Sequence, residues 1–205
     1  MIYRNFQNLK LSALGMGAMR LPVIDGDDTR VDQELVNKMV ACAMEGGVNY
    51  YDTAWGYHGG QSELAMGRAL AAYPRESFYL ADKFPGYDLS NMDKVEEIFE
   101  KQLEKCGVEY FDYYLLHDMG HDNYGKFQEA GAFDMVAKMK AEGKIRHVGF
   151  SCHDKAPFLD RVLTEHPELE FVQIQLNYLD WESPGIQARE AYEMITKHNK
   201  PVIVM

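Results

Sequence analysis

The sequence predicts an α/β fold of the (β/α)8 TIM-barrel class, on the strength of three observations. Apolar, β-branched runs alternate with segments of helical period, which is the pattern of βα units around a parallel sheet. The expected strand ends fall about 24 to 35 residues apart, near positions 17, 52, 83, 117, 151, 175 and 205. The 205 residues hold about seven strands and six helices, whereas a complete barrel takes about 250 residues. We therefore expect a single barrel domain over residues 1–205, apparently truncated after strand seven.

Each predicted strand is a short apolar run bounded by polar residues or glycine. After an N-terminal hairpin over residues 3–14, we expect seven barrel strands at residues 14–17, 48–52, 78–83, 110–117, 146–151, 171–175 and 201–205. The spacing leaves room for one helix between successive strands. No linker, charge run or low-complexity segment marks a second domain.

The first predicted helices are amphipathic and end at recognisable signals. A helix over residues 31–45 ends at Gly46-Gly47, because glycine is favoured just beyond a helix C-terminus. Its expected apolar stripe consists of Leu35, Val36, Met39, Val40, Ala43 and Met44. The next helix opens near Ser62, after a glycine-rich loop.

Caps also predict the later helices. Ser90-x-x-Asp93 is a capping box, and it precedes a stripe made of Val95, Ile98, Phe99, Leu103 and Cys106. A single helix is expected over residues 127–142. Asp154 is the predicted cap of the helix after strand five, and Ser183-Pro184 predicts a cap followed by a first-turn proline.

The composition is that of an ordinary globular protein and narrows the classes of partner. The chain is 46% hydrophobic and 26% charged, with a net charge of −11, which disfavours nucleic acid and anionic membranes as general partners. No apolar run approaches the length of a membrane span, and the first residues do not form a secretion signal. Three widely spaced cysteines fit reduced thiols. We therefore expect a cytoplasmic location.

Four polar residues follow the expected strands where a barrel carries its active site. Asp52 ends strand two, Tyr57 lies just beyond it, Lys83 ends strand three and His117 ends strand four. Because these strands are consecutive, their side chains are expected to meet at one mouth of the barrel. Singly, each residue has an ordinary structural explanation; four of them in register favour a catalytic site.

These residues resemble the signature of the aldo-keto reductase family. The similarity runs from Asp52-Thr53-Ala54-Trp55-Gly56-Tyr57 through Ser62-Glu63 to Gly67-Arg68-Ala69-Leu70, and it includes the Leu115-Leu116-His117 end of strand four. The resemblance implies a catalytic tetrad of Asp52, Tyr57, Lys83 and His117. Tyr57 is then the proton donor to a carbonyl, Lys83 stabilises its phenolate, Asp52 positions the lysine and His117 orients the carbonyl oxygen.

The resemblance also implies a nicotinamide cofactor, NADP(H), with NAD(H) as the alternative. The positions that match its contacts are Gly17, Met19, Arg20, Asp52, Ser151 and Gln173. Cys152 departs from the pattern, because many members carry asparagine there. The family's main contacts to the cofactor's adenine and 2′-phosphate lie after strands seven and eight, so this chain alone is expected to bind the cofactor weakly. Trp55 and Tyr87, in loops after strands, are expected to line the substrate pocket.

Two other functions stay open at this point. The same fold serves as a non-catalytic regulatory or binding subunit in relatives of this family. A divalent-metal hydrolase or isomerase is the other alternative, since residues 117–122 contain two histidines and two aspartates, although we expect no metal site. The Gly15-x-Gly17-x-x-Arg20 segment lacks the third glycine of a dinucleotide fingerprint, which argues against a Rossmann fold.

The expected partners are a small-molecule substrate and other copies of the chain. We predict a carbonyl substrate, no nucleic acid, no membrane, and self-association through the unpaired edges of strands one and seven. Residues 151–154 and 175–180 resemble a bacterial branch of the family whose members carry a C-terminal ferredoxin-like domain. An iron–sulfur cluster is therefore expected only if such a domain lies beyond Met205.

Overall fold

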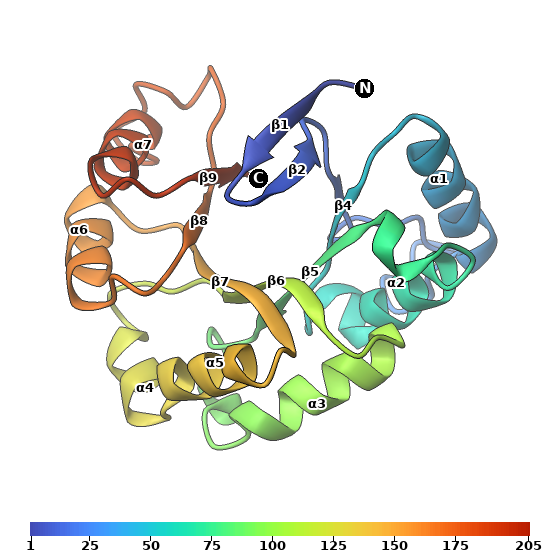
Figure 1. The fold of residues 1–205 in the computed structure, drawn as a ribbon, viewed down its shortest axis with the longest axis horizontal. Coiled ribbons are helices and arrows are strands. Elements are labelled where there is room, and N and C mark those ends of the chain that lie inside the picture. Colours follow the sequence, from blue (N-terminus) through green and yellow to red (C-terminus); the bar gives the residue numbers. More distant parts are fainter. The chain divides into compact units, whose positions relative to one another are not determined.

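A computed structural model describes residues 1–205 and divides them into two compact units. The first unit comprises Met1–Phe84 and Glu96–Tyr113, and the second comprises Pro85–Val95 and Tyr114–Met205. The predicted N-terminal hairpin is present as β1 (Tyr3–Phe6) and β2 (Leu9–Ser12), which pair antiparallel. It precedes the barrel strands along the chain (Figure 1).

All seven predicted barrel strands are present. They are β3 (Met16–Gly17), β4 (Tyr50–Asp52), β5 (Tyr79–Phe84), β6 (Phe111–Leu116), β7 (Ile145–Cys152), β8 (Phe171–Ile174) and β9 (Val202–Val204). Their order in the sheet follows their order in the chain, and β3-β4-β5 and β7-β8-β9 pair in parallel. This is the strand order of a (β/α)8 barrel, and it confirms the predicted fold class.

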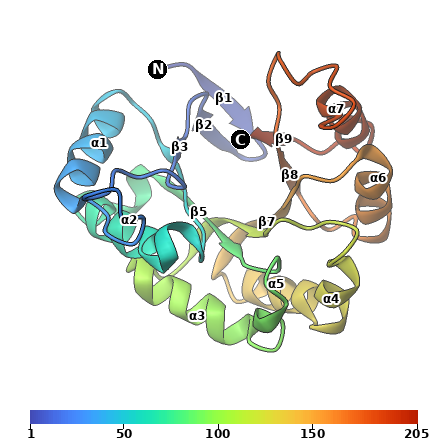
Figure 2. The same cartoon turned by 180° about the vertical axis from the view of Figure 1, so that it is seen from behind.

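Seven α-helices lie between these strands along the chain, one in each connection except that between β6 and β7, which holds two. They are α1 (Gln33–Glu45), α2 (Ser62–Leu70), α3 (Val95–Cys106), α4 (Tyr124–Glu129), α5 (Ala132–Ala141), α6 (Ala156–Glu165) and α7 (Ala188–Lys197). Short 3-10 turns occur at η1 (Tyr57–Gly60), η2 (Arg75–Ser77) and η3 (Leu89–Asn91). In the first unit, α1, α2 and α3 lie outside the strands (Figure 2).

The predicted apolar stripe is buried on α3 but only in part on α1. On α3, the expected residues Ile98, Phe99 and Leu103 are buried, and the Phe99 ring meets Phe111 of β6 edge-on, with 5.9 Å between centroids. On α1 only Val36 and Val40 are buried. Leu35 and Met39, which were predicted to belong to the buried stripe, are exposed. The buried face of α1 is therefore narrower than the spacing of its apolar residues predicts.

In the second unit, β7 and β8 approach each other closely at Gly149, which is opposite Phe171 in the register. A Cβ at position 149 would lie 2.4 Å from the Phe171 carbonyl oxygen. Glycine is therefore required there by close packing rather than by backbone angle. The register that it permits continues to the Ser151–Gln173 pair.

Gly131 divides the helix that was predicted over residues 127–142. Its φ of +66° is incompatible with a continuing helix, so the chain forms α4 and α5 instead. The capping box at Ser90 is also wrong. Both the amide and the hydroxyl of Ser90 donate to the Asp88 carboxylate. Asp88 is thereby the N-cap of η3, and Ser90 lies inside this turn instead of capping α3.

Two further caps were predicted wrongly. Lys155, not Asp154, is the N-cap of α6, because the Asp154 carboxylate is engaged by the amides of His121 and Lys155 outside the helix. Ser183-Pro184 opens no helix; α7 begins at Ala188 after Gln187, which has a φ of +54°.

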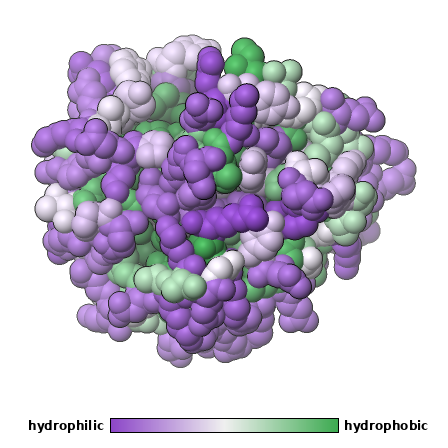
Figure 3. All heavy atoms as spheres, in the orientation of Figure 1, coloured by the Kyte–Doolittle hydropathy of each residue, from purple (hydrophilic) through white to green (hydrophobic).

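No helix in the structure combines the length and the apolar character needed to cross a membrane. Hydrophilic residues cover most of the face drawn in Figure 3, with smaller apolar areas between them. Every residue of β4, β6 and β8, and every residue of β5 after Tyr79, is buried, so these strands are shielded from water on both sides, and the helices carry further buried apolar side chains.

Candidate active site

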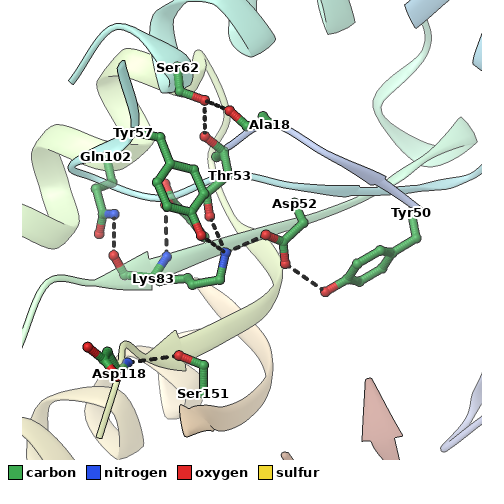
Figure 4. Close-up of polar contacts among 11 residues, drawn as sticks. Ala18, Tyr50, Asp52, Thr53, Tyr57, Ser62, Lys83, Gln102, Asp118 and Ser151 are labelled. Carbon is green, nitrogen blue, oxygen red and sulfur yellow. Dashed lines mark hydrogen bonds and ion pairs between the residues drawn. The ribbon is translucent and has the colours of Figure 1, made fainter. Parts of the chain in front are cut away.

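Asp52, Tyr57 and Lys83 come together in the first unit, at the carboxyl ends of β4 and β5 (Figure 4). Asp52 is the last residue of β4, and Lys83 is the penultimate residue of the adjacent parallel strand β5. Tyr57 begins the turn η1 that follows β4. Parallel strands end at one edge of a sheet, which explains why these three residues, chosen from the sequence pattern, lie together.

The Lys83 ammonium has three acceptors for its three N–H groups. It donates to Asp52 Oδ1, to the Thr53 carbonyl oxygen at 2.8 Å and to Tyr57 Oη at 3.3 Å. The Lys83 side chain is 1% exposed. A buried ammonium is strongly disfavoured unless it is paired and hydrogen-bonded. The three acceptors satisfy that requirement and fix the direction of the lysine side chain.

The charges in this cluster follow from burial and pairing. Burial lowers the pKa of Lys83, but Asp52 and Tyr57 outweigh it and the net pKa is raised, so the lysine is an ammonium at neutral pH. Burial raises the pKa of Tyr57 above 10.0, and the lowering by Lys83 only partly offsets this. The sequence led us to expect a phenol acidified by the lysine; the net shift is upward, because the phenol is largely desolvated.

The geometry directs the Tyr57 proton outward. Lys83 donates to Tyr57 Oη, so the phenol oxygen accepts from the ammonium and its own hydrogen faces away from it. A neutral phenol held in this way can donate to an oxygen placed on its other side. The cluster is therefore arranged for proton transfer from Tyr57, with a positive charge already beside the oxygen that would lose the proton.

Several supporting residues were missed by the sequence analysis. Tyr50 donates its O–H to Asp52 Oδ2 at 3.3 Å, and burial raises the Tyr50 pKa well above its usual range, so it stays protonated as a donor. Gln102 of α3 donates to the Lys83 carbonyl oxygen at 2.9 Å. The alternation of side chains along β4 puts Tyr50 on the same side as Asp52, and this was the available signal.

A second hydrogen-bonded chain joins the loop after β4 to the segment after β3. The hydroxyls of Thr53 and Ser62 are 2.9 Å apart, and Ser62 donates to the Ala18 carbonyl oxygen at 3.0 Å. The Ala18 amide in turn donates to the Asp52 carbonyl oxygen at 2.8 Å. Of the predicted cofactor positions beside Ala18, Gly17 and Arg20 are exposed, and Met19 is 56% exposed.

Trp55, a predicted pocket residue, is half-buried and packs beneath a lysine. Lys105 Nζ lies 4.2 Å from the centroid of the Trp55 ring, and the same ammonium pairs with the fully buried carboxylate of Glu63. Gln102 donates to the other oxygen of Glu63 at 3.1 Å. The position of the Trp55 ring is thus tied to α2 and α3.

In the second unit, Ser151 and Gln173 are neighbours on β7 and β8. They are Cα partners in the register and are 1% and 4% exposed. Ser151 Oγ accepts from the Asp118 amide at 2.8 Å, and the Ser151 carbonyl oxygen accepts from the Met119 amide at 2.8 Å. A hydroxyl that already accepts one hydrogen bond retains its own hydrogen for a ligand. A hydroxyl beside a side-chain amide fits a carboxamide, which both donates and accepts.

His117 and Tyr87 also lie in the second unit and contact each other. Their ring centroids are 5.2 Å apart and the rings are nearly perpendicular. His117 is half-buried and Tyr87 is 43% exposed. The structure thus joins Asp52 with Tyr57 and Lys83, and His117 with Tyr87. That all of these residues meet at one mouth stays a prediction.

The histidines and aspartates of residues 117–122, the alternative metal site, do not form a cluster that could hold a metal ion. No group of three or more histidine, cysteine, aspartate or glutamate residues in the structure is placed to hold a metal ion. The His121 amide donates to Asp154, and His147 pairs with Glu170 at 2.8 Å. Burial raises the pKa of Cys152 to about 12, so this cysteine remains a thiol.

The fold and the site together define the class, an α/β barrel protein with a buried Asp–Lys–Tyr cluster at its strand ends. Residues 13–205 match the model of the Aldo/keto reductase family. The chain therefore belongs to the aldo/keto reductase family.

Individual relatives are moderately similar. The chain is 29% identical over 183 residues to an aldo-keto reductase of Mycobacterium avium (strain 104), covering 88% of this chain and 59% of the relative. It is 25% identical over 193 residues to an NADH-specific methylglyoxal reductase of Escherichia coli (strain K12), covering 84% and 57%. It is 30% identical over 151 residues to an L-galactose dehydrogenase of Arabidopsis thaliana, covering 70% and 45%. The chain thus spans about half the length of these relatives.

Solved structures share the fold over the whole chain. The holo form of an aldo-keto reductase from Bacillus halodurans superimposes with a TM-score of 0.78 at 25% identity, over 100% of this chain and 65% of that one. An aldo-keto reductase from Klebsiella pneumoniae in complex with NADPH gives a TM-score of 0.77 at 21% identity, over 100% and 68%.

Proposed function

We propose that this chain provides the catalytic portion of an NAD(P)H-dependent oxidoreductase that reduces an aldehyde or ketone to an alcohol. The observation that carries the proposal is the Lys83 ammonium, which is held by Asp52 and donates to the Tyr57 oxygen. Family membership supports the reaction class, and the site supports the assignment of the proton donor.

The reaction requires a hydride on the carbonyl carbon and a proton on the carbonyl oxygen. The nicotinamide cofactor supplies the hydride when it is bound. Tyr57 donates the proton through the hydrogen that faces away from Lys83. The C=O π bond breaks, a C–H and an O–H bond form, and the Tyr57 phenolate remains. The proton on Tyr57 is later restored from solvent.

Lys83 favours the transition state over the ground state. Its ammonium makes an ordinary hydrogen bond to a neutral phenol, and this bond becomes charge-assisted as the Tyr57 oxygen loses its proton. Asp52 balances the lysine charge in the resting site, so the ammonium does not need water. If the interaction with Lys83 lowers the pKa of the phenol by one unit in the transition state, the phenolate is stabilised by about 1.36 kcal/mol.

The remaining predicted residues take the other roles. Ser151 and Gln173 hold the nicotinamide carboxamide, and Gly17, Met19, Arg20 and the end of β4 at Asp52 contact the cofactor. His117 donates a hydrogen bond to the substrate oxygen and orients it, with Tyr87 against its ring. Trp55 and Tyr87 form the walls of the substrate pocket.

NADP(H) is the proposed cofactor, and NAD(H) is the alternative. A similar solved reductase is in complex with NADPH, whereas one relative is described as NADH-specific. The chain spans about half the length of the relatives that it matches, so further contacts to the cofactor are expected outside these residues. A cytoplasmic location and a small-molecule substrate complete the proposal.

The decisive experiment follows NADPH and NADH consumption with a panel of aldehydes, ketones and quinones. We expect turnover by the unaltered protein and a loss of at least about a hundredfold in kcat for Tyr57→Phe, the lower range for a general acid. Cofactor binding by the variant, followed by fluorescence, is the control. A Tyr57→Phe variant with nearly unaltered kcat would refute the role of Tyr57. Cofactor binding without turnover of any substrate would favour a non-catalytic binding subunit.

A further inference from the structure

His58, which directly follows Tyr57, adopts a backbone conformation that is uncommon for residues other than glycine. Its φ of 54° and ψ of 41° lie in the left-handed region, which favours glycine and asparagine. A histidine there carries a backbone cost of about 1 kcal/mol. The residue is only 4% exposed, so the ring does not simply extend into water. The contacts of the ring explain why a histidine occupies the position.

Both ring nitrogens of His58 bind the segment between β3 and α1. Nε2 lies 2.8 Å from the Leu21 amide nitrogen, and Nδ1 lies 3.0 Å from the Asp28 carbonyl oxygen and 3.0 Å from Asp28 Oδ1. The Leu21 amide can only donate, so Nε2 is the acceptor. The ring proton is therefore on Nδ1 and is donated to Asp28.

The segment held by His58 is a compact loop with its own hydrogen bonds. Val23 and Val31 form an antiparallel bridge, and the Asp32 amide donates to the Pro22 carbonyl oxygen at 2.8 Å. The loop also packs on the turn beside His58: a Cβ on Gly59 would lie 2.9 Å from the Thr29 methyl group. The turn η1 and the loop over residues 21–31 are therefore fastened together next to Tyr57.

Met19 and Arg20 lie between two fixed points. On one side, Ala18 is bonded through its amide to Asp52 and through its carbonyl oxygen to Ser62. On the other side, Leu21 is bonded through its amide to His58. The two exposed residues between them form a short tip. Its backbone is held on both sides by residues between 52 and 62, the part of the chain that also contains Tyr57.

We propose that His58 is a positioning residue that holds the segment from Gly17 to Arg20 in the conformation that binds the cofactor. This inference rests on the proposed function, because it assumes that the segment contacts a nicotinamide cofactor. A segment ordered before binding loses less conformational entropy when the ligand arrives, so its order strengthens binding. His58 acts through the Leu21 amide and not by contact with the reacting atoms.

Two substitutions separate the role of the ring from the role of the backbone. In His58→Gln the side-chain oxygen reaches about as far as Nε2 and can accept from Leu21. In His58→Asn the side chain ends near the position of Nδ1 and cannot. Asparagine tolerates the left-handed conformation better than glutamine does. A purely backbone role therefore favours the asparagine variant, whereas the proposed contact favours the glutamine variant.

The test measures NADPH KM and kcat for the unaltered protein and both variants, together with hydrogen exchange of the Leu21 amide without cofactor. We expect His58→Asn to raise the NADPH KM about fivefold and to speed Leu21 exchange about as much, the effect of one net hydrogen bond. His58→Gln should recover most of both, and kcat should change little in either variant. Equal or better behaviour of the asparagine variant would overturn the inference.

The two proposals fail in different ways. If the unaltered protein neither binds nor oxidises NADPH or NADH, the proposed function is wrong and the cofactor role of His58 falls with it, while Leu21 exchange still decides whether the ring contact exists. If the unaltered protein is active but the variants keep its NADPH KM, the proposed function stands and the inference about His58 is refuted.

Discussion

Lys83 Nζ lies 3.3 Å from Tyr57 Oη while also pairing with Asp52, so one buried ammonium joins the candidate proton donor to its counter-ion. Lys83→Met removes the ammonium and leaves the Asp52 carboxylate without its main partner. Breaking a buried ion pair in this way typically costs about 3–5 kcal/mol. We expect a loss of stability of that order, measured by urea unfolding, together with loss of reductase activity.

The double variant Asp52→Asn with Lys83→Met is the matched control. Neutralising both partners removes the unpaired charge, so we expect urea stability to recover by at least about 2 kcal/mol over Lys83→Met alone. Activity should not recover, because the phenolate of Tyr57 still lacks its ammonium. Recovery of activity along with stability would mean that Lys83 is only structural.

The pH dependence of the reductase reaction follows from the state of Tyr57. The protonated phenol is the active form in reduction, and burial holds its pKa above the ordinary 10.0. Deprotonation therefore removes activity only at pH values above about 10. We expect kcat to show no loss from this group between about pH 6 and 9. A pH–rate profile that falls with an apparent pKa near 7 or 8 would contradict the upward shift.

The sequence predicted the strand ends and the residues on them because both rest on a strong, repeated pattern. Asp52 and Lys83 directly follow apolar strands, and the parallel register of β4 and β5 then leaves little choice about where their side chains meet. Tyr57 lies on the short turn η1, which ends two residues before α2 begins and so keeps Tyr57 close to the end of β4. Local pattern and tertiary structure agree at these positions.

Predictions failed where several local signals competed. Ser90 has the spacing of a capping box, but Asp88 lies two residues earlier and takes both of its donors. Gly131 is one glycine within a helical pattern, and only the structure tells that its φ is positive. The pairing of His58 with Leu21 joins residues 37 apart in the chain, and no periodicity predicts such a contact.

Self-association of the 205-residue chain is expected through the ends of its sheet. β3 and β9 are the first and last strands of the order, so each has one hydrogen-bonded neighbour, and Val204 on β9 is 55% exposed. An unpaired apolar edge invites pairing with another chain, and a lysine on the edge opposes it. Light scattering should detect association that Val204→Lys reduces. Leu179→Lys, at a 78% exposed loop position, is the control that should not reduce it. A monodisperse monomer would refute the prediction.

Glu170 should lower the free energy of unfolding of the second unit as the pH falls below about 4.5. Burial raises the pKa of this carboxyl, but hydrogen bonds from His147, Lys140 and the Val148 amide outweigh it and lower the pKa from 4.5 to about 2. The charged form is thus favoured by folding. Its contribution is complete above about pH 4.5, where the unfolded chain is also ionised, and it is lost as the pH falls through about 2.

Glu170→Gln tests this contribution against the unaltered chain. The shift corresponds to about 3 kcal/mol at most, and partial exposure of the carboxylate reduces the expected loss to about 1–2 kcal/mol at pH 7. Urea midpoints should therefore differ clearly at pH 7, approach each other as the pH falls from about 4.5, and converge only below about pH 2, where the glutamate of the unaltered protein also becomes neutral. Glu129→Gln, whose carboxylate pairs with Lys126 on an exposed helix face, should show no such convergence because it contributes little at any pH. A Glu170→Gln difference that is the same at both pH values would show that the loss comes from packing and not from charge.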